Sequence, residues 1–143
     1  PFLVWERDRV GLHSGFMGAQ VSASALLALG RTRASTQASA QSISTNADNQ
    51  DIVSMGTIAA ISTFELFEHA ASLCAITSMM LAQAMELISP TLEGFAPSSQ
   101  ELFARVRAHS PRLERDRPLA DEIASLARAL PYELPREGDT LTR

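Results

Sequence analysis

The chain has 143 residues, a length typical of one domain, and a formal net charge of −4. That acidic balance argues against a nucleic-acid-binding protein, because nucleic acid is bound by basic surfaces. A single cysteine, Cys74, excludes an intrachain disulfide and a metal site of several cysteines, and it is consistent with a reducing cytoplasm, where we expect the protein.

Charge is distributed very unevenly along the chain. Between residues 10 and 63 only Arg31, Arg33, Asp48 and Asp51 are charged, whereas residues 101–143 are rich in both acidic residues and arginine. An ordinary solvated surface is about a quarter charged or more, so we expect the first region to be mostly hidden from water. A chain this short buries too little of its own surface for that, which predicts a homo-oligomer.

The first half of the chain predicts one helix between two irregular segments. Residues 1–15 form a lead-in that ends in a turn at Ser14-Gly15, and residues 16–33 have the apolar spacing of a helix. Residues 34–50 are rich in serine, threonine and amides, which favours either a disordered polar linker or a hydrogen-bonded amide network. Asp48 or Asn49 could cap the helix that follows.

Residues 51–88 contain no proline and only one glycine, Gly56, which predicts a single long helix. At 1.5 Å per residue it would be about 55 Å long, more than the ~30 Å of a small domain, so we expect it to pack beyond its own chain. Residues 70–85 carry no formal charge. We still predict no membrane span, because the stretch is short and contains Ser72, Thr77, Ser78 and Gln83.

Ser89-Pro90 ends the long helix. Two shorter helices are predicted over residues 98–130, the first capped by Ser98 or Ser99 and the second opened by Pro118 with an apolar stripe from Leu119 to Leu130. Residues 131–143 form a tail. The fold predicted for residues 1–143 is therefore a single all-α unit: a long-helix bundle with short C-terminal shell helices.

Three motifs occur in a fixed order along this chain. They are Ser14-Gly15-Phe16-Met17-Gly18-Ala19-Gln20, the polar loop from Ser42 to Gly56, and Asp116-Arg117-Pro118-Leu119 followed by Asp121-Glu122-Ile123. Together they resemble the C-terminal portion of the aromatic amino-acid ammonia-lyases and aminomutases, which are several times longer. The resemblance implies a homotetramer whose long helices form a central bundle and whose active sites are each shared by several subunits.

The resemblance also implies the chemistry. Such enzymes eliminate ammonia from an aromatic L-amino acid with methylidene-imidazolone, an electrophile formed from their own Ala-Ser-Gly triplet. No Ala-Ser-Gly occurs in this chain. We therefore expect the electrophile and the catalytic tyrosines in an N-terminal portion, from the same gene or a separate chain. Within this chain we expect no catalytic residue, no self-made cofactor and, for the chain alone, no lyase activity.

Four residues are expected to bind substrate, and their roles are implied by the resemblance. Gln50 lies where phenylalanine and tyrosine enzymes carry glutamine and histidine enzymes carry glutamate, which favours a phenyl or phenol substrate. Asn49 is a neighbouring amide, Asn46 lies where plant phenylalanine enzymes carry glutamate, and Met17 lies where histidine enzymes carry methionine. Without the resemblance, the amides would be interpreted as a helix cap and Met17 as packing.

Other interpretations stay open. The protein could be an aromatic aminomutase, or a non-catalytic helical assembly fragment that lacks the electrophile. Glu65 and His69 have the i,i+4 spacing of a metal pair, but without a second ligand motif we expect no metal. Cys74 is predicted to be a buried small apolar residue rather than a nucleophile.

Overall fold

The computed structural model describes residues 2–35 and 38–130; the tail predicted at residues 131–143 lies outside the described residues. The α-helices are α1 (Met17–Ser35), α2 (Gly56–Ile88), α3 (Pro97–His109) and α4 (Ala120–Ala129), and the 3-10 turns are η1 (Arg7–Arg9) and η2 (Ala38–Gln41). Within those described ranges there is no strand, only two isolated bridges. The predicted all-α fold is confirmed.

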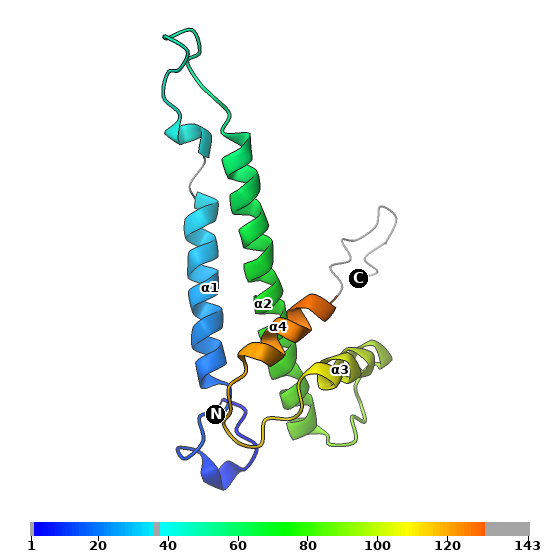
Figure 1. Cartoon of the computed structure of the whole chain (residues 1–143). Helices are drawn as coiled ribbons and strands as arrows, with labels where there is room; N and C mark the ends of the chain where they lie inside the picture. The colour runs from blue at the N-terminus through cyan, green and yellow to red at the C-terminus, as the bar shows by residue number, and fades with distance from the viewer. Residues whose placement is uncertain (1, 36–37, 131–143) are drawn as a thin grey trace.

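Helices α1 and α2 form a long antiparallel hairpin, and Figure 1 shows them side by side with the polar loop at the far tip. An ion pair between Arg33 and Glu65 joins them near the tip. They also approach closely at Gly30, where an added Cβ would lie 3.6 Å from Leu66. The hairpin is therefore stabilised by close packing and by one ion pair that crosses from helix to helix.

The predicted start of the long helix was wrong. It begins at Gly56 rather than Asp51, after Met55 in the left-handed region (φ 52°), and no side chain caps it. Asp48 and Asn49 cannot cap this helix because they belong to a turn several residues earlier, where Asp48 accepts a hydrogen bond from Ser44.

The predicted start of the next helix was wrong for a different reason. Helix α3 begins at Pro97, with Ala96 at the N-cap, so Ser98 and Ser99 lie inside the first turn and do not cap it. Proline suits the first helical position because its missing N–H would have no partner there. The lead-in also differs from expectation, since it contains the short turn η1.

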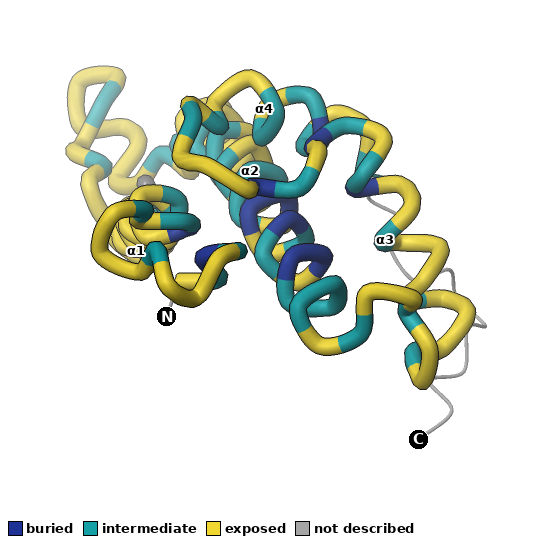
Figure 2. The backbone as a smooth tube through the Cα atoms, turned by 90° about the horizontal axis from the view of Figure 1, so that it is seen from below, coloured by how far each residue is buried: buried dark blue, intermediate teal, exposed yellow. Residues whose placement is uncertain are grey.

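The hydrophobic core lies where α3 and α4 pack on the C-terminal half of α2, and Figure 2 shows the buried positions gathered there. Leu126 of the predicted α4 stripe is fully buried, and Leu119, Ile123 and Leu130 pack against the core. The buried members of the core are Phe16, Ala75, Met79, Ala82, Val106, Leu113 and Leu126. This core holds the lead-in and the C-terminal helices around one end of α2.

The other end of the hairpin has no core of its own. Helix α1 contains no buried residue, and α2 exposes large apolar side chains, namely Ile58, Ile61, Phe64 and Phe67. In the single chain the low-charge region is largely exposed, so this chain does not itself provide the expected cover. Cys74, which was predicted to be buried, is exposed as well, and that prediction is wrong for the single chain. Cover of these apolar side chains by other copies of the chain remains a prediction.

Among the described residues, α2 is the one helix long and apolar enough to cross a membrane. This is weak evidence, because core helices of proteins that never enter a membrane have the same length and composition. The absence of a membrane span stays a prediction.

Candidate functional site

The tip of the hairpin is a closed turn. Thr45 and Gln50 form an antiparallel bridge, in which the Thr45 N–H donates to the Gln50 carbonyl (3.0 Å) and the Gln50 N–H donates back (3.3 Å). Inside it, the Asn49 N–H donates to the Asn46 carbonyl at 3.2 Å. The backbone that carries the three predicted amides is therefore fixed by its own hydrogen bonds.

Three consecutive residues of this turn, Asn46, Ala47 and Asp48, lie in the left-handed region, with φ of 56°, 53° and 64°. Asparagine and aspartate tolerate it, whereas for alanine it costs roughly 1–2 kcal/mol. The Ser44 hydroxyl donates to Asp48 Oδ1 at 2.8 Å and supports the turn. Strained backbone of this kind collects at functional sites, where the surrounding contacts maintain it.

The side chains of Asn46, Asn49 and Gln50 are all exposed at this tip. Each primary amide offers two donated hydrogens and an accepting oxygen without a charge, so together they can bind polar groups of either hydrogen-bonding sense. Two alternatives were open for residues 34–50. Because these three amides are exposed, they do not form a buried network. Because Thr45 and Gln50 are bridged, residues 45–50 are not a disordered linker either. The tip is an exposed polar surface that carries three neutral amides and the carboxylate of Asp48.

Met17, the fourth predicted site residue, lies far from the other three. It is the first residue of α1, which has 19 residues and so is about 28 Å long, and the amide turn lies beyond the opposite end. Its side chain is 41% exposed and free to contact another surface. A single chain therefore does not bring Met17 together with the amides.

Two of the three sequence motifs touch at the beginning of α1. Asp116 Oδ2 accepts from the Ser14 N–H (2.8 Å), and Oδ1 accepts from the Gly15 N–H (3.0 Å). The Ser14 N–H lowers the pKa of Asp116; burial opposes this, while the Gly15 N–H and the charge of His13 act with it. Sequence reasoning missed this contact because 102 residues separate the partners and no local pattern connects them.

Beside Asp116, the side chain of Arg117 is held by a network of hydrogen bonds. Arg117 donates to both carboxylate oxygens of Glu122 (2.8 and 3.1 Å) and to the carbonyls of Pro111 (2.7 Å) and Arg112 (3.1 Å). Burial raises the pKa of Glu122, but hydrogen bonds from Arg117 and Ser110 and the nearby positive charge outweigh it, so the pKa is lowered overall. The network fixes the backbone that follows Asp116.

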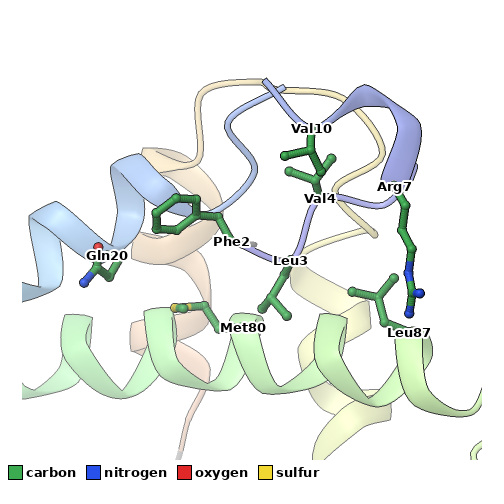
Figure 3. Close-up of a pocket in the computed structure, with 8 residues that line it drawn as sticks. All are labelled: Phe2, Leu3, Val4, Arg7, Val10, Gln20, Met80 and Leu87. Atoms are coloured by element: carbon green, nitrogen blue, oxygen red, sulfur yellow. The ribbon is translucent and has the colours of Figure 1, made fainter. Parts of the chain in front are cut away.

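A cavity of about 770 Å³ lies between the lead-in and α2 (Figure 3). Its lining is mostly apolar and consists of Phe2, Leu3, Val4, Arg7, Val10, Gln20, Met80 and Leu87. None of the predicted substrate-binding residues lines it. Arg7 and Gln20 are the polar members of this lining, and neither was predicted to bind substrate.

The absence of a metal at Glu65 and His69 stays a prediction. Glu65 is engaged with Arg33, and residues 2–35 and 38–130 contain no group of three His, Cys, Asp or Glu that could hold a metal ion.

Comparison with known proteins agrees with the motifs. Residues 1–108 match a family model described as aromatic amino acid lyase. The chain is 50% identical to the tyrosine ammonia-lyase of Cereibacter sphaeroides over 136 residues and 42% identical to the MIO-dependent tyrosine 2,3-aminomutase of Streptomyces globisporus over 120 residues. It is also similar to the crystal structure of histidine ammonia-lyase from Trypanosoma cruzi, with a TM-score of 0.78 and 31% identity over 90% of this chain.

These similarities cover nearly the whole chain but only part of each relative. The matches span 94% and 84% of this chain, against 25% and 22% of the two curated relatives and 24% of the solved structure. The chain thus spans about a quarter of their length. The resemblance inferred from the three motifs is confirmed, with this chain aligned to one portion of a longer enzyme.

Proposed function

The chain belongs to the aromatic amino acid lyase family, and we propose that it supplies part of the substrate pocket of an enzyme that eliminates ammonia from an aromatic L-amino acid. The observation that carries the proposal is the bridged turn from Thr45 to Gln50, which presents three exposed amides in a fixed arrangement. Asn46, Asn49 and Gln50 would bind and orient the polar groups of the amino acid, and no proton transfer is assigned to them.

The proposed substrate preference follows from the neutral side chain of Gln50. The side-chain amide of Gln50 is neutral, so it can bind near a phenol or a phenyl ring and does not require a cationic substrate ring. A carboxylate in that place would favour imidazole, which becomes cationic near neutral pH. We therefore propose tyrosine or phenylalanine over histidine, and the 50% identity with a protein named tyrosine ammonia-lyase supports this choice.

We further propose that one pocket takes Met17 and the amide turn from different copies of the chain. The two lie at opposite ends of α1, so they cannot meet within one copy. The apolar side chains exposed along α2 provide the surface on which copies can pack. A homotetramer accommodates both the separation of Met17 from the amide turn and the apolar surface of α2. We propose that it works in the cytoplasm, without a nucleic-acid or membrane partner.

The electrophile must come from elsewhere. Methylidene-imidazolone, when present, supplies the acceptor that turns the amino group into a leaving group. The residues here do not fit its formation, because there is no Ala-Ser-Gly to cyclise, and the exposed amides of the turn suit substrate binding instead. We propose that an N-terminal portion, of the same gene product or a separate polypeptide, carries the triplet.

The second candidate is a helical assembly fragment without catalysis, favoured by the same missing triplet. Denaturing mass spectrometry of the purified material, followed by a product assay with L-tyrosine, L-phenylalanine and L-histidine, separates the two. A partner polypeptide lighter than its sequence by two waters, together with an arylacrylate product, supports the lyase; a β-amino acid product supports the aminomutase. A lone unmodified chain that makes neither is the assembly fragment.

The chain verified to be alone and unmodified should release no arylacrylate. Release by such material would contradict the assignment of the electrophile to another portion.

A further inference from the structure

We propose that Asp116 is a positioning residue for the substrate pocket: its carboxylate fixes the turn of residues 14–16 and thereby sets where the Met17 side chain enters the pocket. The proposal rests on the pocket role of Met17 given above. It adds a residue from the third sequence motif to the site, although Asp116 itself need not touch the substrate.

The turn before α1 has its backbone donors fully engaged. Ser14 and Gly15 donate to the two oxygens of Asp116, and the next N–H, of Phe16, donates to the Phe2 carbonyl at 2.9 Å. The N–H of Met17 donates to the Ser14 carbonyl at 3.2 Å. Four consecutive N–H groups therefore have defined partners, and Asp116 holds the first two.

The turn also has little steric freedom. Gly15 has φ +55°, and a Cβ there would lie 2.5 Å from the Phe2 carbonyl oxygen. Phe16 is only 2% exposed and is part of the core. Met17 follows directly as the first helical residue, so a displacement of this turn displaces the Met17 side chain with it.

Asp116 is itself held on both sides. On one side, the Leu113 N–H and carbonyl bond the side-chain amide of buried Gln83 at 3.2 and 3.0 Å. On the other side, Arg117 is fixed by Glu122 and by two backbone carbonyls. A carboxylate mounted on so constrained a segment can define the position of its partners rather than follow them.

The chemistry requires a carboxylate of this length. An asparagine side chain in its place would keep the size, but a donating NH₂ replaces one of the two accepting oxygens, so it cannot accept one N–H at each oxygen as Asp116 does. The variant Asp116→Asn therefore releases one of the two donors. Asp121→Asn is the matched control, because Asp121 is an exposed carboxylate nearby in the same motif.

The test measures KM and kcat for L-tyrosine on the active assembly. We expect Asp116→Asn to raise KM by about three- to tenfold with a smaller change in kcat, since misplacing a binding group weakens orientation. In a Met17→Ala background the same substitution should change KM by less than about twofold, because coupled residues are not additive. Asp121→Asn should leave both constants near wild type.

Amide hydrogen exchange supplies a readout independent of activity. The Ser14 and Gly15 amides should exchange faster in Asp116→Asn and unchanged in Asp121→Asn. Should Asp116→Asn fail to assemble, Gly15→Ala perturbs the same turn from the other side and should reproduce the rise in KM.

Unchanged exchange, an unchanged KM, or full additivity with Met17→Ala would overturn the positioning role while leaving the proposed function intact. A wild-type assembly that carries the electrophile and still makes no product would instead overturn the proposed function and this proposal with it.

Discussion

The side chain of Gln83 joins three separate segments, so its replacement by methionine should be unusually costly. Gln83 is completely buried on α2. Its Nε2 donates to the carbonyls of Leu3 (3.2 Å) and Leu113 (3.0 Å), and its Oε1 accepts from the Leu113 N–H (3.2 Å) and from Arg107 (3.5 Å). Methionine would retain most of the volume and remove every one of these bonds.

The magnitude follows from the groups left behind. In Gln83→Met the N–H and the carbonyl of buried Leu113 both lose their partner. An unsatisfied buried polar group costs roughly 1–3 kcal/mol, so the pair should lower the free energy of unfolding by about 4 kcal/mol. For a chain of this size, that corresponds to a melting temperature lower by about 10 °C.

Urea denaturation at a fixed protein concentration measures this effect, because assembly makes stability concentration-dependent. Trp5 fluorescence is a suitable probe: the Arg112 guanidinium lies 4.1 Å from its ring centre, so it reports docking of the lead-in against the loop that Gln83 holds. Gln100→Met is the matched control, since Gln100 bonds two loop carbonyls in an exposed setting, and it should cost less than about 1 kcal/mol. Equal losses for the two variants would show that the buried hydrogen bonds of Gln83 are not the cause.

Three further predictions concern other contacts. Gly15→Ala places a Cβ 2.5 Å from a carbonyl oxygen at a residue with positive φ, so it should lower the free energy of unfolding by at least about 1–2 kcal/mol. Gly18→Ala lies at an open helical position and should raise it by about 0.5–1 kcal/mol. Thermal unfolding that gives both variants a change of the same sign would contradict this. Arg107→Met breaks the ion pair with Glu86, whose two side chains are 14% and 16% exposed, and should lower the free energy of unfolding by about 2–3 kcal/mol. Arg105→Met breaks a pair with Glu101 that is more than half exposed and should lower it by about 0.5 kcal/mol or less. Comparable urea midpoints for the two variants would argue against a role for burial. Because the folded-state pKa of Asp116 is lowered below 3.8, its carboxylate stabilises the fold above that pH and the contribution is lost as the pH falls through the lowered pKa. The stability deficit of Asp116→Asn should therefore shrink below about pH 3.8, and a deficit that grows on acidification would show that another group is responsible.

The helices could be predicted where local spacing decides them. The apolar stripe of α4 and the continuous pattern of α2 depend on neighbours three and four residues apart, which the sequence displays directly. The start of α2 could not be predicted, because it depends on Met55 adopting a left-handed backbone and on the bridge that keeps residues 45–50 in the loop. Neither of these follows from the propensities of the residues concerned.

The candidate site likewise has features that the local sequence reveals and features that depend on distant contacts. The amide turn could be located because its residues form a continuous motif, but its shape depends on left-handed residues such as Ala47, which composition does not reveal. Asp116 and Gln83 act across long stretches of chain, so no local signal marks them. The exposure of α1 could not be predicted either, since low charge indicates burial in an assembly and does not say whether the chain itself provides the cover.

Substrate selection by Gln50 and its neighbouring amides is the central claim of the proposed function. It can be tested by a competition assay in which the active assembly, wild type or Gln50→Glu, is given equal L-tyrosine and L-histidine and the two arylacrylates are quantified. Their ratio reports the ratio of kcat/KM values. We expect the tyrosine product to dominate in the wild type and Gln50→Glu to shift the ratio toward the histidine product by about tenfold or more, as about 1.4 kcal/mol of new charge interaction would give. A ratio that Gln50→Glu leaves unchanged, in an assembly that is otherwise active, would mean that this turn does not select the substrate.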